Sequence, residues 1–92
     1  MLEGISKVYY ENGMLQTELS FKNNKLDGIS REYYANGALK TIGNYKEGGR
    51  EGITATYYED GVLKWEAKFK DDKLQEIPTE YFETGRIKYI ER

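Results

Sequence analysis

The chain has 92 residues, enough for one small domain with a modest core, and carries no histidine and no cysteine. This composition excludes disulfides, thiol nucleophiles, the common zinc sites and histidine-based catalytic triads. The net charge is −2, with acids and bases interspersed and no basic run, which argues against nucleic acid or anionic lipid as a partner. The sequence shows no membrane-length apolar stretch and no secretory signal after Met1, so we expect a cytoplasmic location.

A 24-residue repeat begins at Gly4. Three full units, 4–27, 28–51 and 52–75, are followed by a shorter fourth unit, 76–92, within one predicted domain spanning 1–92. Each unit repeats an isoleucine, an aromatic pair, a glycine and then a leucine or isoleucine. The columns are Ile5, Ile29, Ile53, Ile77; Tyr9-Tyr10, Tyr33-Tyr34, Tyr57-Tyr58, Tyr81-Phe82; Gly13, Gly37, Gly61, Gly85; and Leu15, Leu39, Leu63, Ile87. Coincidence in so many columns at one period indicates a tandem-repeat fold.

Each unit reads as a β-hairpin. Asn12-Gly13 is a favoured dipeptide of the two-residue type I′ turn, in which both residues have positive φ. Asn36-Gly37 and Asp60-Gly61 repeat it, and Thr84-Gly85 is a poorer version. The flanking residues are aromatic or β-branched, as strands prefer. The second connection, such as 22–27, is predicted to be longer. At its centre stand residue types that tolerate the left-handed conformation, namely Asn24, Gly48 and Asp72.

The four hairpins predict an all-β fold: a single twisted antiparallel meander of about eight strands, open and solenoid-like. A two-residue turn would place Tyr10 opposite Leu15 and Tyr9 opposite Gln16. One face of the first unit then carries Val8, Tyr10, Leu15, Thr17, Leu19 and Phe21, and the other carries Ile5, Lys7, Tyr9, Gln16 and Glu18. The former is the richer in apolar residues, as expected for a sheet with one solvated side.

The fourth unit is atypical, because Glu76 replaces the opening glycine and Pro78 falls in a predicted strand. These changes suit a terminal capping repeat.

The pattern G-x-x-x-x-Y-Y-x-N-G-x-L, followed by an aromatic residue and a short loop, resembles the bacterial variant of the MORN repeat over essentially the whole chain. Asn24 and Asp72 depart from it, standing where that family often has glycine. The variant is frequent in antitoxins of the YwqK type from toxin–antitoxin systems. The resemblance therefore implies an antitoxin or immunity-like protein, or a generic interaction repeat. MORN repeats also occur outside the catalytic domains of certain eukaryotic lipid kinases, so an accessory fragment of a larger protein mislabelled as a lipid kinase is an alternative.

No catalytic, cofactor-binding or metal-binding residues are predicted. Carboxylates such as Glu18, Glu66 and Asp71-Asp72 fall on exposed strands or in turns, whereas acid–base catalysis needs contrasting environments within a pocket. The candidate partner-binding stripe contains one tyrosine per unit, and Trp65 is a second candidate: Tyr9, Tyr33, Tyr57, Tyr81 and Trp65. The alternative is structural, with the rings covering the sheet backbone and Trp65 filling a gap in the core.

The first hypothesis for function is a non-enzymatic protein-interaction module that occludes a partner, such as a toxin, through a sheet face or edge-strand pairing. The alternative is a membrane-surface or phosphoinositide-binding repeat, against which the balanced charge argues. Two sheet edges and an aromatic face also predict possible self-association into a homo-oligomer.

Overall fold

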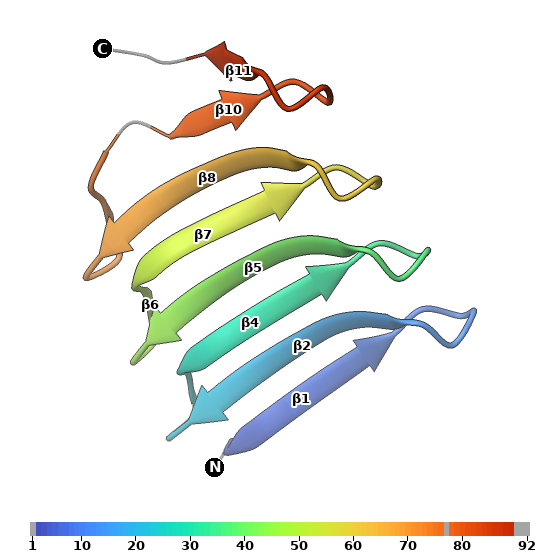
Figure 1. Ribbon diagram of the computed structural model, residues 1–92. Coiled ribbons are helices and arrows are strands. Elements are labelled where there is room, and N and C mark those ends of the chain that lie inside the picture. Colours follow the sequence, from blue (N-terminus) through green and yellow to red (C-terminus); the bar gives the residue numbers. More distant parts are fainter. Residues whose placement is uncertain (1, 77, 90–92) are drawn as a thin grey trace.

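A computed structural model describes residues 2–76 and 78–89 as one antiparallel sheet (Figure 1). The strands of this part of the chain are β1 (Gly4–Tyr9), β2 (Leu15–Lys22), β3 (Lys25–Leu26), β4 (Gly28–Tyr33), β5 (Leu39–Lys46), β6 (Gly49–Arg50), β7 (Gly52–Tyr57), β8 (Leu63–Lys70), β9 (Lys73–Leu74), β10 (Thr79–Tyr81) and β11 (Ile87–Tyr89). Eight of them lie side by side in the order β1-β2-β4-β5-β7-β8-β10-β11, which confirms the predicted meander. The two-residue strands β3, β6 and β9 pair with β2, β5 and β8.

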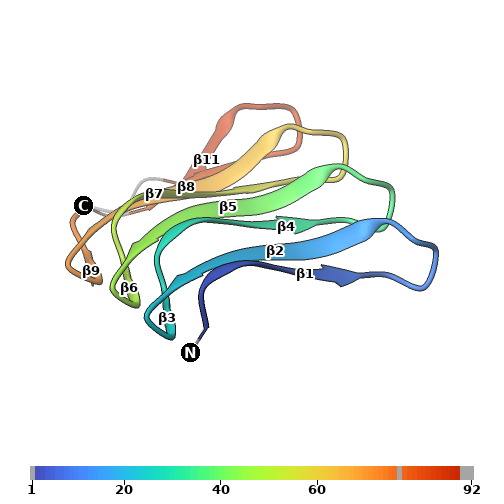
Figure 2. The same ribbon diagram turned by 90° about the horizontal axis from the view of Figure 1, so that it is seen from below.

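The sheet forms a single layer. All the described strands belong to this one sheet, and the molecule measures 42 × 35 × 12 Å. The buried apolar residues are Ala55, Ala67 and Phe69, and no described side chain is less than 2% exposed. Figure 2 shows the curved layer, with the turns at β3, β6 and β9 in a row along one side. Both faces of the sheet therefore remain uncovered.

The turns after the tyrosine pairs are not the predicted type I′ turns. Gly13, Gly37 and Gly61 have positive φ, whereas the residues before them do not. In the first unit, Gly13 N donates to Tyr10 O (3.0 Å) and Tyr10 N donates to Met14 O (2.8 Å). These bonds enclose a three-residue loop, a type I turn followed by a left-handed glycine. The Asn12 side chain accepts a hydrogen bond from Met14 N at 2.9 Å, so the asparagine serves as an acceptor rather than as a left-handed residue.

The two-residue turn with positive φ occurs instead at the opposite end of each hairpin. Asn23 and Asn24 have φ of 52° and 66°, and the Lys22–Lys25 pair of β2 and β3 flanks them. Glu47-Gly48 and Asp71-Asp72 repeat this turn. The predicted left-handed positions Asn24, Gly48 and Asp72 are confirmed. The predicted longer connection thus contains a tight turn and a short extra strand.

An acidic side chain closes each of these turns. The carboxylates of Glu3, Asp27 and Glu51 accept hydrogen bonds, at 2.9, 3.2 and 3.1 Å, from the backbone N–H groups of Asn23, Glu47 and Asp71. The acids are spaced 24 residues apart in the sequence. They stabilise turns whose first residue, with positive φ, is never glycine.

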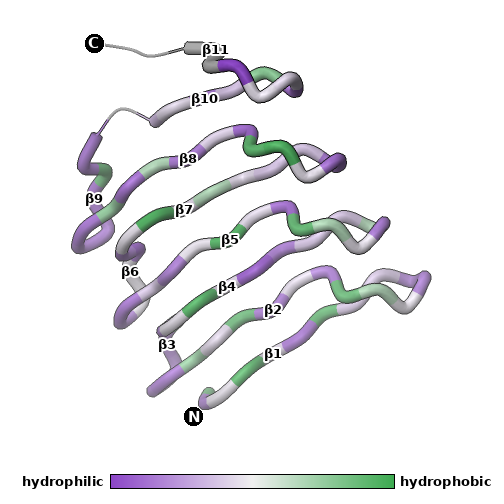
Figure 3. The backbone as a smooth tube through the Cα atoms, viewed as in Figure 1, coloured by the Kyte–Doolittle hydropathy of each residue, from purple (hydrophilic) through white to green (hydrophobic). Residues whose placement is uncertain are grey.

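The register differs from the prediction by one residue near the tyrosine pair. Val8 pairs with Thr17, but Tyr9 pairs with Leu15, so Gln16 is an extra, bulged residue. The predicted pairings of Tyr9 with Gln16 and Tyr10 with Leu15 are therefore wrong, because the loop is one residue longer than a type I′ turn. Away from the bulge, Val8, Thr17, Leu19 and the facing strand residues share a face as predicted. Figure 3 shows the resulting mixture of hydropathy along the strands.

The fourth unit opens with a shorter strand than the others. Strand β10 has three residues, whereas β1, β4 and β7 each have six. Pro78 precedes β10 and does not lie in a strand as predicted, because proline has no N–H for the ladder. Ile77, the fourth member of the isoleucine column, lies outside the described residues.

Candidate functional site

The strand register assigns each side chain to one of two faces. The first face is defined by one row of paired residues that crosses the sheet, and the second face by the adjacent row. The first-face row is Val8, Thr17, Glu32, Thr41, Thr56, Trp65 and Glu80; the second-face row is Lys7, Glu18, Arg31, Ile42, Ala55, Glu66 and Thr79.

On either side of its central row, the second face carries a set of isoleucines, which alternate with Ser20, Asn44 and Lys68 of the facing strands, and a set of tyrosines. Strand alternation places the isoleucines two residues before the central row and the tyrosines two residues after it. We name these residues together the isoleucine–tyrosine face: Ile5, Ile29, Ile53, Tyr9, Tyr33, Tyr57 and Tyr81. The isoleucines are 63%, 43% and 58% exposed. Tyr9 is exposed, and the other three tyrosines are half-buried. The predicted tyrosine stripe thus runs beside a row of exposed aliphatic side chains.

The exposed isoleucines were not predicted as part of the site. Their column was evident in the repeat and on the same side of the sheet as the tyrosines, which was the available signal. In Figure 3 the tube is green near the beginnings of β4 and β7, where Ile29 and Ile53 lie. The central row between the isoleucines and tyrosines is apolar at Ile42 and at the buried Ala55.

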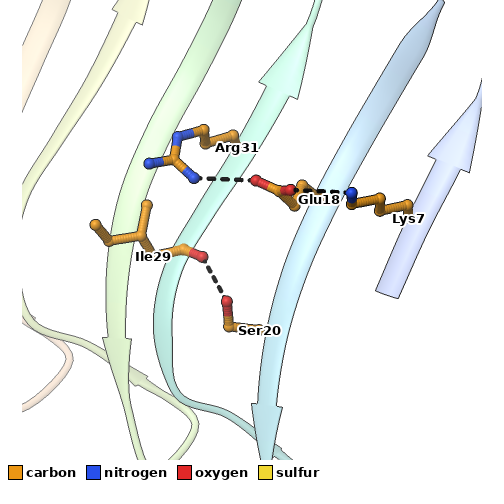
Figure 4. A network of polar contacts seen from close by, with 5 residues as sticks. All are labelled: Lys7, Glu18, Ser20, Ile29 and Arg31. Carbon is orange, nitrogen blue, oxygen red and sulfur yellow. Dashed lines mark hydrogen bonds and ion pairs between the residues drawn. The ribbon is translucent and has the colours of Figure 1, made fainter. Parts of the chain in front are cut away.

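A charged network occupies the N-terminal part of the second face. The Glu18 carboxylate accepts a hydrogen bond from Arg31 Nη1 at 3.0 Å, and Lys7 Nζ lies 3.9 Å from its other oxygen. Figure 4 shows Lys7 and Arg31 on either side of Glu18, with the Ser20 hydroxyl donating to Ile29 O nearby. The next two positions of the row are Ile42 and Ala55. The network therefore lies within the face, between the isoleucines and the tyrosines of the first two units, and the row becomes apolar at Ile42 and Ala55.

Trp65 lies on the first face, in register with Thr56 and Glu80. Tyr57 follows Thr56 along β7 and so belongs to the opposite face. The structure therefore brings the four stripe tyrosines together on one side of the sheet and places Trp65 on the other.

The second tyrosine of each pair joins successive units. Tyr10 Oη donates to Tyr33 O at 2.6 Å, Tyr34 Oη donates to Tyr57 O at 2.6 Å, and Tyr58 Oη donates to Tyr81 O at 2.8 Å. We name these contacts the inter-unit hydroxyl bonds. Each accepting carbonyl belongs to a stripe tyrosine, so the bonds fix the backbone from which the stripe projects.

A pocket of about 240 Å³ lies on the first face between β2, β4, β5 and β7. Its lining residues are Thr17, Leu19, Ser30, Arg31, Glu32, Thr41, Gly43, Tyr45, Arg50 and Thr54. Half of these residues are glycine, serine or threonine, whose small side chains leave a depression in the sheet surface.

Within residues 2–76 and 78–89, no three His, Cys, Asp or Glu side chains are grouped to hold a metal ion. Among these same residues, no helix has the length and apolar character required to cross a membrane.

Comparison with known proteins identifies the repeat. The pattern of the MORN repeat variant matches residues 2–23, 26–47 and 50–71, and the fourth unit lies outside these ranges. A search of curated proteins finds no match. MORN repeats are non-catalytic and are generally modules of the binding type. The three matches recur at the same 24-residue spacing as the strands and cover most of the chain. The chain therefore belongs to the MORN repeat variant family.

Proposed function

We propose that this protein is a non-enzymatic protein-interaction module, and that its isoleucine–tyrosine face binds a protein partner. The observation that carries the proposal is the recurrence of a large exposed isoleucine in each of the first three units, beside the tyrosine row. Large apolar side chains that recur on an uncovered sheet face are typical of interaction sites. The binding character of MORN repeats supports the same function.

The composition of this face suits a protein interface. Tyrosines supply the aromatic side chains that are enriched among residues dominating binding energy. Ile42 and Ala55 provide apolar contacts in the central row, and the Lys7–Glu18–Arg31 network provides charged groups in the same row. The sheet measures 42 × 35 Å, so the area of one face exceeds the roughly 800 Å² that each partner buries in a standard interface. A partner could therefore be held without contributions from the other face.

An antitoxin-like role is the specific form of this function that we propose. In that role, the isoleucine–tyrosine face would cover the active surface of a toxin and act by occlusion. The resemblance of the repeat pattern to antitoxins supports this form, and the toxin would be the protein partner.

The experiment compares partner capture by the wild type and by a double variant, Ile29→Ser with Ile53→Ser. Both side chains are substantially exposed, so the variant should fold, which circular dichroism would verify. The matched control is Leu74→Ser, which removes an exposed aliphatic side chain in β9, outside the face. We expect a partner captured by the wild type and by Leu74→Ser to be lost with the double variant.

Titration calorimetry with the purified partner then measures the loss. For each isoleucine that the partner would bury, truncation to serine should cost about 1–2 kcal/mol of binding free energy. The double variant should therefore bind at least about tenfold more weakly. Equal affinity of the double variant and the wild type would refute this surface. Binding to anionic vesicles with no protein partner would instead favour the membrane alternative.

A further inference from the structure

We propose that the first-face pocket binds the positively charged side chain of an arginine or lysine from a protein partner. The pocket lies on the opposite side of the sheet from the isoleucine–tyrosine face, so this site is additional to the proposed binding surface. Its size, the carboxylate of Glu32 and an unpartnered hydroxyl group carry the inference.

The pocket exists because the second unit combines two small residues in columns where one or the other neighbouring unit carries a larger one. Gly43 in β5 occupies the column in which the other units have Leu19 and Ala67. A Cβ atom at Gly43 would lie 3.3 Å from Thr54 Oγ1, so even an alanine would crowd the floor. Thr41 likewise stands where the third unit has Trp65. The depression is therefore a feature of the second unit and not of the repeat in general.

A carboxylate lines this pocket without a basic partner. Glu32 is half-buried, with Thr17 and Thr41 beside it in the same row of the first face. No ion pair or hydrogen bond joins its carboxylate to another group among the described residues. The corresponding residues of the first and third units, Val8 and Thr56, are uncharged. A cation entering the pocket would pair with Glu32 in a partly desolvated setting, where such pairing is stronger than in water.

A second polar group of the pocket also lacks a partner. Ser30 lies two residues before Glu32 on β4 and is only 9% exposed. Its hydroxyl oxygen is buried and has no hydrogen-bond partner in the part of the chain that the structure describes. Such a group is costly to leave unpaired. Ammonium and guanidinium groups only donate hydrogen bonds, and both Glu32 and Ser30 can accept them. Glu32 and Ser30 therefore suit a cation better than an anion.

Two arginines also line the pocket, of which Arg31 is paired with Glu18 of the second face and Arg50 lies at the border opposite Glu32. The Arg50 guanidinium lies 5.1 Å from the centre of the Phe69 ring, and β6 pairs with the far end of β5 at Tyr45. A bound cation would be repelled from this border and attracted to Glu32. Its aliphatic stem would lie against Leu19, Tyr45 and the floor at Gly43.

The volume sets the size of the occupant. A pocket of about 240 Å³ is smaller than the roughly 300–1,000 Å³ of sites for drug-sized ligands. It suits one long side chain rather than a whole metabolite.

The test uses a probe that carries only this side chain. Amide chemical shifts of the isotope-labelled protein are followed by NMR during titration with N-acetyl-arginine N-methylamide. The control probe, N-acetyl-norleucine N-methylamide, has an aliphatic stem and no charge. We expect saturable shifts around the pocket in β2, β4 and β5, with a millimolar dissociation constant, for the arginine probe alone. Equal responses to both probes, or shifts scattered over the sheet, would overturn the proposal.

Three variants sharpen the test, and the dispersion of their NMR spectra verifies folding. Glu32→Gln should weaken binding about tenfold, because a charge-assisted hydrogen bond is lost. Glu80→Gln is the matched control. It removes the same charge from the corresponding position of the fourth unit, which pairs with Trp65 and lies outside the pocket, so this variant should bind the probe as the wild type does. Thr41→Trp introduces the residue that the third unit carries in this column, and it should abolish binding by filling the pocket.

Unchanged binding in both Glu32→Gln and Thr41→Trp would overturn the site. The double variant Ile29→Ser with Ile53→Ser should bind the probe normally. Failure of this pocket is thus distinguishable from failure of the proposed protein-binding face.

Discussion

Replacing Tyr34 with phenylalanine tests whether the inter-unit hydroxyl bonds hold the repeats together. The substitution keeps the ring and removes the hydroxyl that donates to Tyr57 O at 2.6 Å in a partly buried position. A hydrogen bond of this kind contributes about 0.5–1.5 kcal/mol net, and the carbonyl left without its donor favours the upper half of that range. We therefore expect the free energy of unfolding to fall by about 1 kcal/mol.

Urea unfolding followed by circular dichroism measures this change. With a denaturant slope of about 1 kcal/mol/M, at the low end for small proteins, the midpoint should fall by roughly 1 M. Tyr33→Phe is the matched control, because the Tyr33 hydroxyl makes no hydrogen bond with the described residues. That variant should change the unfolding free energy by less than about 0.5 kcal/mol.

A triple variant, with Tyr10, Tyr34 and Tyr58 all replaced by phenylalanine, extends the test. Successive bonds are separated by two strands, or roughly 9–10 Å, so their effects should be nearly additive. The expected loss is about 3 kcal/mol, a large part of the stability of a small domain. If Tyr34→Phe and Tyr33→Phe unfold at the same urea concentration, the hydroxyl bonds do not stabilise the sheet and the reasoning fails.

Three further variants test other contacts, all by urea unfolding. Glu47→Asn should raise the unfolding free energy by about 0.5–1 kcal/mol, because Glu47 has a φ of 51° and asparagine tolerates that conformation better; a lower midpoint would contradict this. Ser30→Ala should raise it by about 1 kcal/mol by removing the unpartnered buried hydroxyl, and destabilisation would show that the hydroxyl has a structural partner. Glu18→Gln should lower it by up to about 1 kcal/mol at low salt and by less in 1 M NaCl, since salt screens its pairing with Arg31; a salt-independent loss would point to packing instead.

The strands and their order could be predicted because the information is local and repeated. Alternating side chains and the recurring glycines mark each hairpin, and consecutive hairpins join into a meander. The turn type could not be predicted from Asn12-Gly13, because this dipeptide suits both a two-residue loop and the end of a three-residue loop. The choice depends on the hydrogen bond from Met14 N to the Asn12 side chain and on the bulge at Gln16. Neither is encoded in the dipeptide itself.

The candidate site was predictable to a similar extent. Alternation correctly places the stripe tyrosines on one face, and their role in binding stays a prediction. The exposure of Ile29 and Ile53 could not be predicted, because isoleucine is usually buried and only the single-layer sheet leaves it uncovered. The pocket at Gly43 was missed because a lone glycine in a strand has several explanations. Comparison with Leu19 and Ala67 in the same column was the signal that could have found it.

The inter-unit hydroxyl bonds give the array a polarity that bears on its engineering. Every such bond runs forward, from a tyrosine of one unit to a carbonyl of the next. At the fourth unit the corresponding residue is Phe82, which lacks the oxygen that would make the contact. A designer lengthening this sheet could add a unit before β1, with its tyrosine aimed at the carbonyl of Tyr9. A unit added after the fourth would lack this bond unless Phe82 were replaced by tyrosine, so extension before β1 keeps a stabilising contact that extension at the other end would have to restore.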